Sequence, residues 1–175
     1  MEILTEDEQA PASYPTAPSG LSTAASALDA DALWQRIEQF ITRRWNERQV
    51  VWIVEGPGVF APRLQPATID TREVWNGDSW ESVTLDAAPL GDELDAKTYR
   101  FTATVGSTDD PPASINEAFV RLAEYLADQS FIGRVATSGT RDLNSTVQAT
   151  SERPAAWQSK ALYYSGAADL LRRYR

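Results

Sequence analysis

Apolar residues recur at helical spacing near the start of the chain. Trp34, Ile37, Ile41 and Trp45 follow one another at intervals of three and four residues, and neighbouring apolar positions widen the stripe. Charged side chains lie mostly between these positions. The pattern predicts an amphipathic helix from about residue 26 to residues 46–49.

A second helix is predicted in "ASINEAFVRLAEYLADQS". Its apolar face carries Ile115, Phe119, Leu122 and Leu126. Ser114 and Glu117 have the spacing of a capping box, in which each side chain binds a free backbone amide of the first turn. Glu117 and Arg121 are spaced to form a favourable pair on the helix surface.

The segments between these helices have the pattern of strands. "QVVWIVEGPGVF" is a β-branched and aromatic run that stops at Gly-Pro-Gly. Asn76-Gly77 lies between two further apolar runs, which predicts a β-hairpin with a type I′ turn. In "KTYRFTATVG" the residues Tyr99, Phe101, Ala103 and Val105 alternate with polar ones, as on a strand with one buried face.

The remaining segments are polar. Residues 1–22, rich in Pro, Ala, Ser and Thr, are expected to be flexible, with a short ordered piece at Met1–Leu4. Residues 131–153 are expected to form a long polar arm. A third helix is predicted from Pro154. It either ends at Ser165-Gly166 or continues through Leu171.

This order predicts an α+β fold. The expected architecture is a small helical bundle of about three helices with an inserted antiparallel β-hairpin or small sheet, a long polar arm and an extended C-terminal tail. The expected divisions are a flexible acidic segment over 1–22, a core over 23–130, the arm over 131–153, and a C-terminal helix and tail over 154–175.

Composition removes most catalytic chemistry. The chain has no cysteine and no histidine, which excludes disulfides, thiolate chemistry and triads that need an imidazole base. Carboxylates such as Glu55, Glu73 and Glu81 remain, but exposed charges on strands are the simpler interpretation. We therefore expect no enzyme activity, no metal site and no cofactor.

Charge is unevenly distributed along the chain. The net charge is −9, which argues against a surface that wraps nucleic acid. No Lys or Arg precedes Arg36, whereas the segment from Arg153 onward is basic. No apolar run is long enough for a membrane span, and the first residues lack the apolar segment of a secretion signal.

Two surfaces are candidates for binding. Trp75 and Trp80 flank the predicted hairpin turn beside Glu73 and Glu81, which is compatible with a carbohydrate-binding module, although cross-strand packing explains the same pattern. At the other end of the chain, leucines, arginines and a tyrosine close the sequence as a docking peptide does. Trp157 precedes that segment and is a possible interface anchor.

Three stretches resemble the head–tail connector (adaptor) proteins of long-tailed bacteriophages and gene transfer agents. "IEQFITRRW" is similar to the first helix of that family. "TYRFTATVGSTDDPPASINEAFVRLAEYLAD" is similar to its strand, proline-containing loop and second helix. "SGAADLLRRYR" resembles its closing motif of small residues, paired leucines and a basic aromatic end.

The resemblance implies a structural virion protein without catalytic activity. It implies a homo-oligomeric ring, commonly of twelve subunits, that joins the portal protein at the capsid vertex to a tail-completion or stopper protein. Double-stranded DNA would pass through the ring without specific binding. The protein would be made in the bacterial cytoplasm and act in the neck of the virion.

The resemblance also implies that the C-terminal docking segment, residues 165–175, inserts into the portal. The residues carried over are Ser165, Gly166, Ala167, Leu170, Leu171, Arg172, Arg173, Tyr174 and Arg175. The alternatives are the carbohydrate-binding module and another tail-completion or stopper protein.

Overall fold

The computed structural model describes residues 1–128 and 157–175, which form two compact units. Unit 1 contains residues 1–15, 41–111 and 174–175. Unit 2 contains residues 16–40 and 112–173, apart from the segment that is not described. Each unit is presented by itself.

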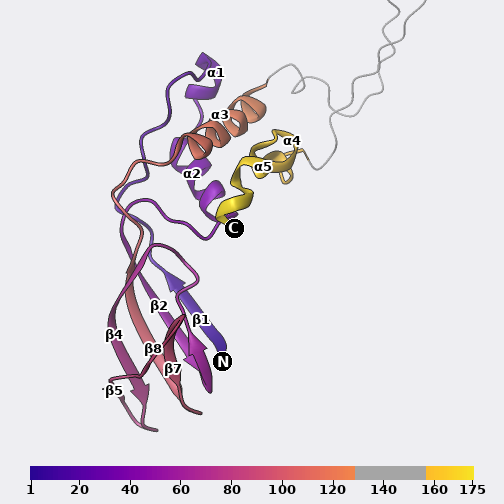
Figure 1. The fold of residues 1–175 in the computed structure, drawn as a ribbon. Coiled ribbons are helices and arrows are strands. Elements are labelled where there is room, and N and C mark those ends of the chain that lie inside the picture. Colours follow the sequence, from indigo (N-terminus) through magenta and orange to yellow (C-terminus); the bar gives the residue numbers. More distant parts are fainter. Residues whose placement is uncertain (129–156) are drawn as a thin grey trace, which may run out of the picture. The chain divides into compact units, whose positions relative to one another are not determined.

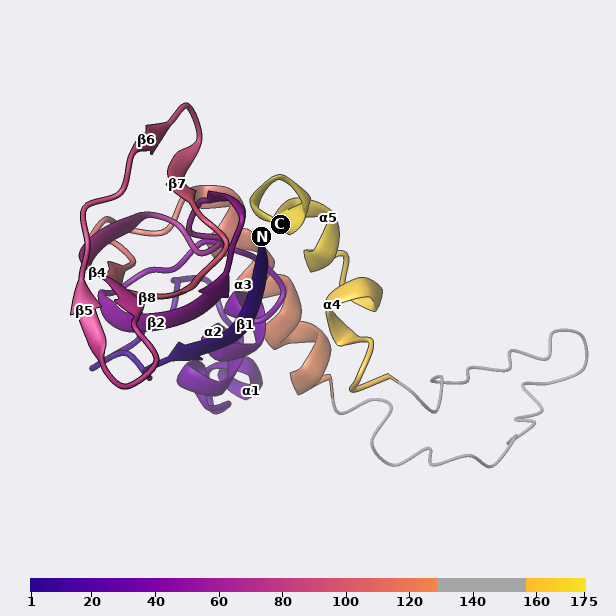
Figure 2. The same ribbon diagram turned by 90° about the horizontal axis from the view of Figure 1, so that it is seen from below.

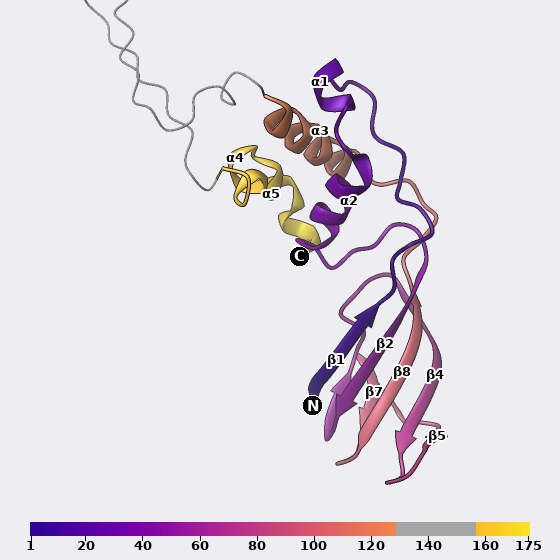
Figure 3. The same cartoon turned by 180° about the vertical axis from the view of Figure 1, so that it is seen from behind.

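Unit 1 is built on a five-stranded antiparallel sheet with the order β1-β2-β8-β4-β5. Figures 1 and 3 show its strands side by side, with β1 and β5 at the two edges. The strands are β1 (Glu2–Glu8), β2 (Arg48–Glu55), β4 (Ala67–Trp75), β5 (Trp80–Ser82) and β8 (Thr98–Val105).

A second, three-stranded sheet covers one face of the first. It has the order β3-β7-β6 and comprises β3 (Gly58–Phe60), β6 (Ala87–Ala88) and β7 (Gly91–Leu94). Figure 2 shows the β6–β7 hairpin beside the strands of the larger sheet. Phe60 stacks on Phe101 of β8 with ring centroids 4.2 Å apart, and Leu94 joins the same apolar core. Burial of these large side chains is the main force holding the two sheets together.

The alternation predicted for β8 is confirmed. Tyr99, Phe101, Ala103 and Val105 are all buried, and the residues between them are half-buried.

The predicted β4–β5 hairpin is also present, but its turn differs. Trp75 pairs with Trp80, so four residues form the loop. The Asn76 side chain accepts hydrogen bonds from the amides of Asp78 and Ser79, both at 2.9 Å. A type I′ turn needs positive φ at both central residues, whereas here Gly77 has φ +106° and Asn76 does not have a positive φ.

Residues 1–22 include an ordered strand where flexibility was expected. Glu8 of β1 receives hydrogen bonds from Arg44 at 2.6 and 3.0 Å and from Arg48 at 3.1 Å. Glu6 accepts a hydrogen bond from the Trp52 indole at 2.8 Å. Glu6 and Glu8 are half-buried, and Asp7 between them is exposed. In the sequence these acids suggest a solvated segment, but their side chains hold the edge strand β1 to β2 and to the loop before β2.

Unit 2 is helical. Its helices are α1 (Thr23–Ser26), α2 (Ala30–Glu38), α3 (Ala113–Ala127), α4 (Ala161–Tyr164) and α5 (Ala167–Leu171). Trp34 of α2 packs on Phe119 of α3 with ring centroids 4.7 Å apart, and both side chains are fully buried. Figure 1 shows α3 with α2, α4 and α5 around it.

The first predicted helix is much shorter than expected. Asp29 caps α2 by accepting hydrogen bonds from the amides of Asp31 and Ala32, and the helix ends at Glu38. The backbone amides of Arg44 and Asn46 bond to Gln65 and Ser107 instead of to a helical turn. The later members of the apolar stripe over 34–45, Ile41 and Trp45, are buried but lie past the end of α2, in unit 1.

The second predicted helix is confirmed as α3, and so is its ion pair of Glu117 with Arg121, at 2.8 Å. The predicted capping box does not form. Pro112 occupies the cap position and makes no side-chain capping bond, so Ser114 lies inside the first turn of the helix.

The C-terminal helix is interrupted at Gly166, as one of the two alternatives predicted, but it is shorter than predicted, because residues 157–160 form a turn and α4 begins at Ala161. Gly166 adopts φ +76°, which ends α4 and lets α5 begin in a new direction. The following residues, Arg172–Tyr174, form a 3-10 helix. Residues 165–174 are thus largely helical, in place of the expected extended tail.

The predicted fold class, a small three-helix bundle with an inserted hairpin or small sheet, is wrong. The described residues contain eight strands in two sheets and five short helices. Several strands have two to four residues, too few for alternation to be detected in the sequence. The expected polar arm, 131–153, lies outside the described residues.

Candidate docking surface

The C-terminal docking segment is anchored by two apolar side chains and exposes basic ones. Ala167 and Leu171 are fully buried, because α5 packs against α3. Leu170 is half-buried, while Arg172 and Arg173 are exposed. In this chain alone, Leu171 therefore belongs to the core of unit 2, and the surface of the segment is largely cationic.

The last two residues belong to unit 1. The carbonyl oxygen of Tyr174 accepts hydrogen bonds from the Thr42 amide at 2.9 Å and from the Thr42 hydroxyl at 3.0 Å. Tyr174 is half-buried and Arg175 is exposed. Arg172 also pairs with Asp169 at 3.1 Å, but both side chains are more than three-quarters exposed, so this pair contributes little to stability.

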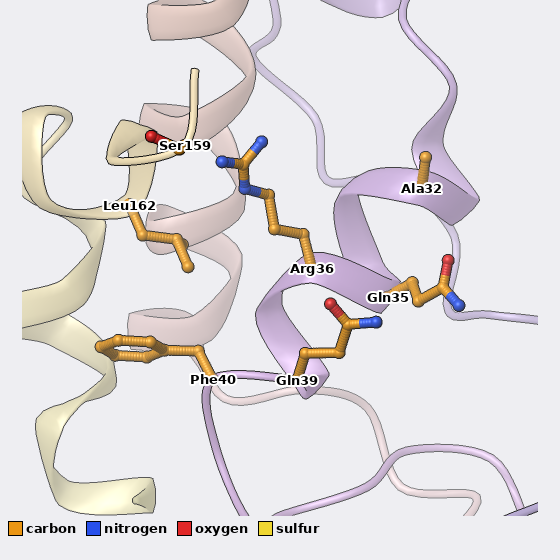
Figure 4. Close-up of a pocket in the computed structure, with 7 residues that line it drawn as sticks. All are labelled: Ala32, Gln35, Arg36, Gln39, Phe40, Ser159 and Leu162. Carbon is orange, nitrogen blue, oxygen red and sulfur yellow. The ribbon is translucent and has the colours of Figure 1, made fainter. Parts of the chain in front are cut away.

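A groove in unit 2 lies between α2 and the turn that leads into α4. We call it the α2–α4 groove; its volume is about 460 Å³, and it is lined by Ala32, Gln35, Arg36, Gln39, Phe40, Ser159 and Leu162. Figure 4 shows Arg36 extending from α2 toward the turn that holds Ser159, with Leu162 and Phe40 on one side. Arg36 donates a hydrogen bond to the carbonyl oxygen of Gln158.

One exposed tyrosine contacts Phe40, which lines this groove. Tyr163 is 57% exposed and meets Phe40 edge to face, with ring centroids 5.6 Å apart. Tyr164 is 46% exposed and lies near Tyr125. Tyrosine and arginine are enriched at protein interfaces, which makes the groove a better candidate for protein binding than for catalysis.

Trp157, the possible interface anchor, is half-buried within unit 2. Its ring meets Tyr125 of α3 edge to face, at 6.3 Å between centroids. Part of its surface therefore stabilises the end of the helical unit, and the rest is open to solvent.

The two units differ sharply in charge. Unit 1 has sixteen acidic and eight basic residues, a net charge of −8. The described part of unit 2 has seven acidic and five basic residues, a net charge of −2. Nearly all of the negative charge of the chain thus belongs to the β-sheet unit.

Trp75 and Trp80 form a cross-strand pair with centroids 5.2 Å apart and ring planes inclined by 59°. Arg100 covers Trp80 at 4.8 Å from its centroid and binds Glu73 through two hydrogen bonds of 2.7 Å. These hydrogen bonds lower the pKa of Glu73. Because the two rings are tilted and the guanidinium lies over Trp80, the pair does not form one flat platform of the kind that stacks on sugar rings.

The candidate catalytic carboxylates are not gathered into one site. Glu73 is held by Arg100, Glu81 is exposed near the hairpin turn, and Glu55 is exposed at the end of β2. Within residues 1–128 and 157–175, no group of three or more His, Cys, Asp or Glu side chains is arranged to hold a metal ion. No helix in the same residues is long and apolar enough to cross a bilayer.

Sequence reasoning did not find the α2–α4 groove. Its lining residues on α2 fall on the polar side of the helical pattern, which suggests solvent exposure. The detectable signal was the pair of tyrosines before Ser165-Gly166, next to Leu162.

No family model, curated protein or solved structure matches the chain.

Proposed function

We propose that the protein is a head–tail connector of a long-tailed bacteriophage or gene transfer agent. In this role it forms a homo-oligomeric ring that binds the portal protein, holds a tail-completion or stopper protein, and surrounds the DNA channel. The proposal is motivated by the three sequence stretches that resemble the connector family.

The observation that carries the proposal is the C-terminal docking segment. Leu171 and Ala167 anchor it in unit 2, and its exposed side chains are mainly arginines on a protein of net charge −9. A preformed helix loses less entropy on binding than a free tail does. Leu170, Arg172 and Arg173 would contact the portal while Leu171 stays buried.

The charge of unit 1 suits a DNA conduit. A surface with a net charge of −8 repels phosphate, so that DNA can pass without being bound. Repetition of the docking segment around a ring would add avidity to contacts that are individually weak.

The test is a triple substitution, Arg172→Ala with Arg173→Ala and Arg175→Ala, in the particle that encodes the protein. We expect the variant to fold, since Arg172, Arg173 and Arg175 are all exposed, and to leave capsids unjoined to tails. A matched control replaces the exposed cations Arg63, Lys97 and Arg121 with alanine, which makes the same change in net charge elsewhere. Normal yields of infectious or transducing particles from the triple variant would contradict the docking role.

A further inference from the structure

The β6–β7 hairpin carries the most exposed large hydrophobic side chain in the described residues. Leu90 is 82% exposed. Ala88 pairs with Gly91, so Pro89 and Leu90 alone form the loop. We call this loop the hairpin tip.

The hairpin tip is held firmly. A Cβ at Gly91 would lie 2.0 Å from the carbonyl oxygen of Phe60, which shows how closely β7 approaches the end of β3. Asp92, the next residue, is buried and pairs with Arg72 at 2.9 Å. An isolated exposed leucine is ordinary, but a leucine at the end of a braced two-residue loop is placed to enter a partner with little loss of entropy.

Carboxylates surround the base of this hairpin. Asp86 and Glu93 are exposed and adjacent, because the Glu93 amide donates a 2.8 Å hydrogen bond to the Asp86 carbonyl oxygen. Asp95 is also exposed. The hairpin therefore presents an apolar tip with acidic flanks.

The α2–α4 groove of unit 2 has the complementary properties. Phe40 and Leu162 provide apolar surface, and Arg36 provides positive charge (Figure 4). None of the seven described lining residues is acidic, and Lys160 is exposed beside Ser159. A volume of about 460 Å³ lies within the range of sites that hold small ligands, and it exceeds what one leucine side chain needs.

We propose that the hairpin tip of one copy inserts into the α2–α4 groove of a second copy. The two surfaces belong to different units, so the contact is heterologous: each copy offers one tip and one groove. Such contacts close into rings when the rotation between copies allows it. The inference rests on the proposed ring and assigns its subunit contact.

The test uses the absence of native cysteine. Full-length Leu90→Cys and Gln39→Cys proteins are mixed in equal amounts and treated with a short bismaleimide over a concentration series. A covalent heterodimer is expected, with a yield at least tenfold above that of a control mixture of Ser82→Cys and Gln39→Cys. Ser82 is exposed on β5, outside the β6–β7 hairpin.

Charge at the groove gives a second readout. Gln35 is exposed and lines the groove, so its substitution spares the core. Gln35→Glu in the Gln39→Cys protein is expected to lower the heterodimer yield at least threefold, and Gln35→Lys to raise it, because the hairpin is acidic. Both effects should weaken in high salt.

Three results would overturn the inference. These are a heterodimer yield equal to the control, a yield insensitive to the charge at residue 35, or a predominance of Leu90→Cys homodimers. None of them bears on the docking segment, because that role is judged by capsid–tail joining in the particle. If the cross-linking test gave no heterodimer but the triple arginine variant still failed to join capsids to tails, the proposed function would stand. The contact between subunits would then lie elsewhere.

Discussion

Replacing Glu8 with glutamine should destabilise unit 1 far more than its position near the N-terminus suggests. Glu8 is the shared acceptor for Arg44 and Arg48, whose side chains are only 8% and 3% exposed. The substitution removes the negative charge and leaves both guanidinium groups buried. Tyr14, which lies 5.8 Å from the Arg48 guanidinium, cannot replace a carboxylate.

The magnitude follows from burial. Removing one partner of a buried ion pair costs about 3–5 kcal/mol. Glu8 itself keeps 24% of its side chain exposed, so water reaches part of the network and lowers the cost. We expect a loss of about 2–3 kcal/mol in the free energy of unfolding, which corresponds to a fall of about 5–10 °C in Tm for a chain of this size.

The pH dependence has a defined sign. Burial raises the pKa of Glu8, but hydrogen bonds from Arg44 and the charges of Arg44 and Arg48 together lower it more, so its pKa in the folded protein lies below 4.5. The stabilisation is therefore complete above pH 4.5 and is lost as the pH falls through the lower, folded-state value. The difference between the wild type and Glu8→Gln should shrink in that acidic window.

The assay is thermal and urea unfolding followed by tryptophan fluorescence, with Asp7→Asn as the matched control. Asp7 is the neighbouring residue on β1, is exposed, and loses the same charge on substitution. If Glu8→Gln unfolded at the same temperature as Asp7→Asn at neutral pH, the network would not hold the edge strand.

Two further substitutions test the packing of each unit. Leu171→Ala should cost about 2–4 kcal/mol in the free energy of unfolding, because Leu171 is fully buried. Leu170 is only half-buried, so Leu170→Ala should cost less than about half as much. Equal costs in urea unfolding would contradict the anchoring role of Leu171. Gly91→Ala should cost about 1–3 kcal/mol in the free energy of unfolding, because its Cβ would overlap the Phe60 carbonyl oxygen. In the control Gly77→Ala, the new Cβ meets no atom within 4 Å, so this variant tests backbone strain alone. A Gly91→Ala protein as stable as the wild type would show that β7 can move away from β3.

The elements with strong hydrophobic periodicity were the part of the fold that could be predicted well from the sequence. β8 and α3 have one continuous buried face each, and both were located from that alternation or stripe. The stripe from Trp34 to Trp45 misled because Ile41 and Trp45 lie past the end of α2, where backbone amides bond to residues distant in the sequence. Local patterns contain no information about such partners.

The N-terminal strand was missed for an electrostatic reason. Acidic residues are usually solvated, and only the folded chain brings Arg44 and Arg48 to Glu8. The basic end of the chain was visible in the sequence, but the burial of Leu171 beside the half-buried Leu170 was not, because adjacent leucines look equivalent until the helix that carries them is placed.

The most direct test of the connector role is the mass of the purified full-length protein, measured by light scattering with and without the portal protein of the same particle. The account predicts a complex that carries many copies of this chain on the portal, and its loss in the triple arginine variant. A portal whose mass is unchanged by the wild-type protein, at concentrations where the protein remains folded, would contradict it.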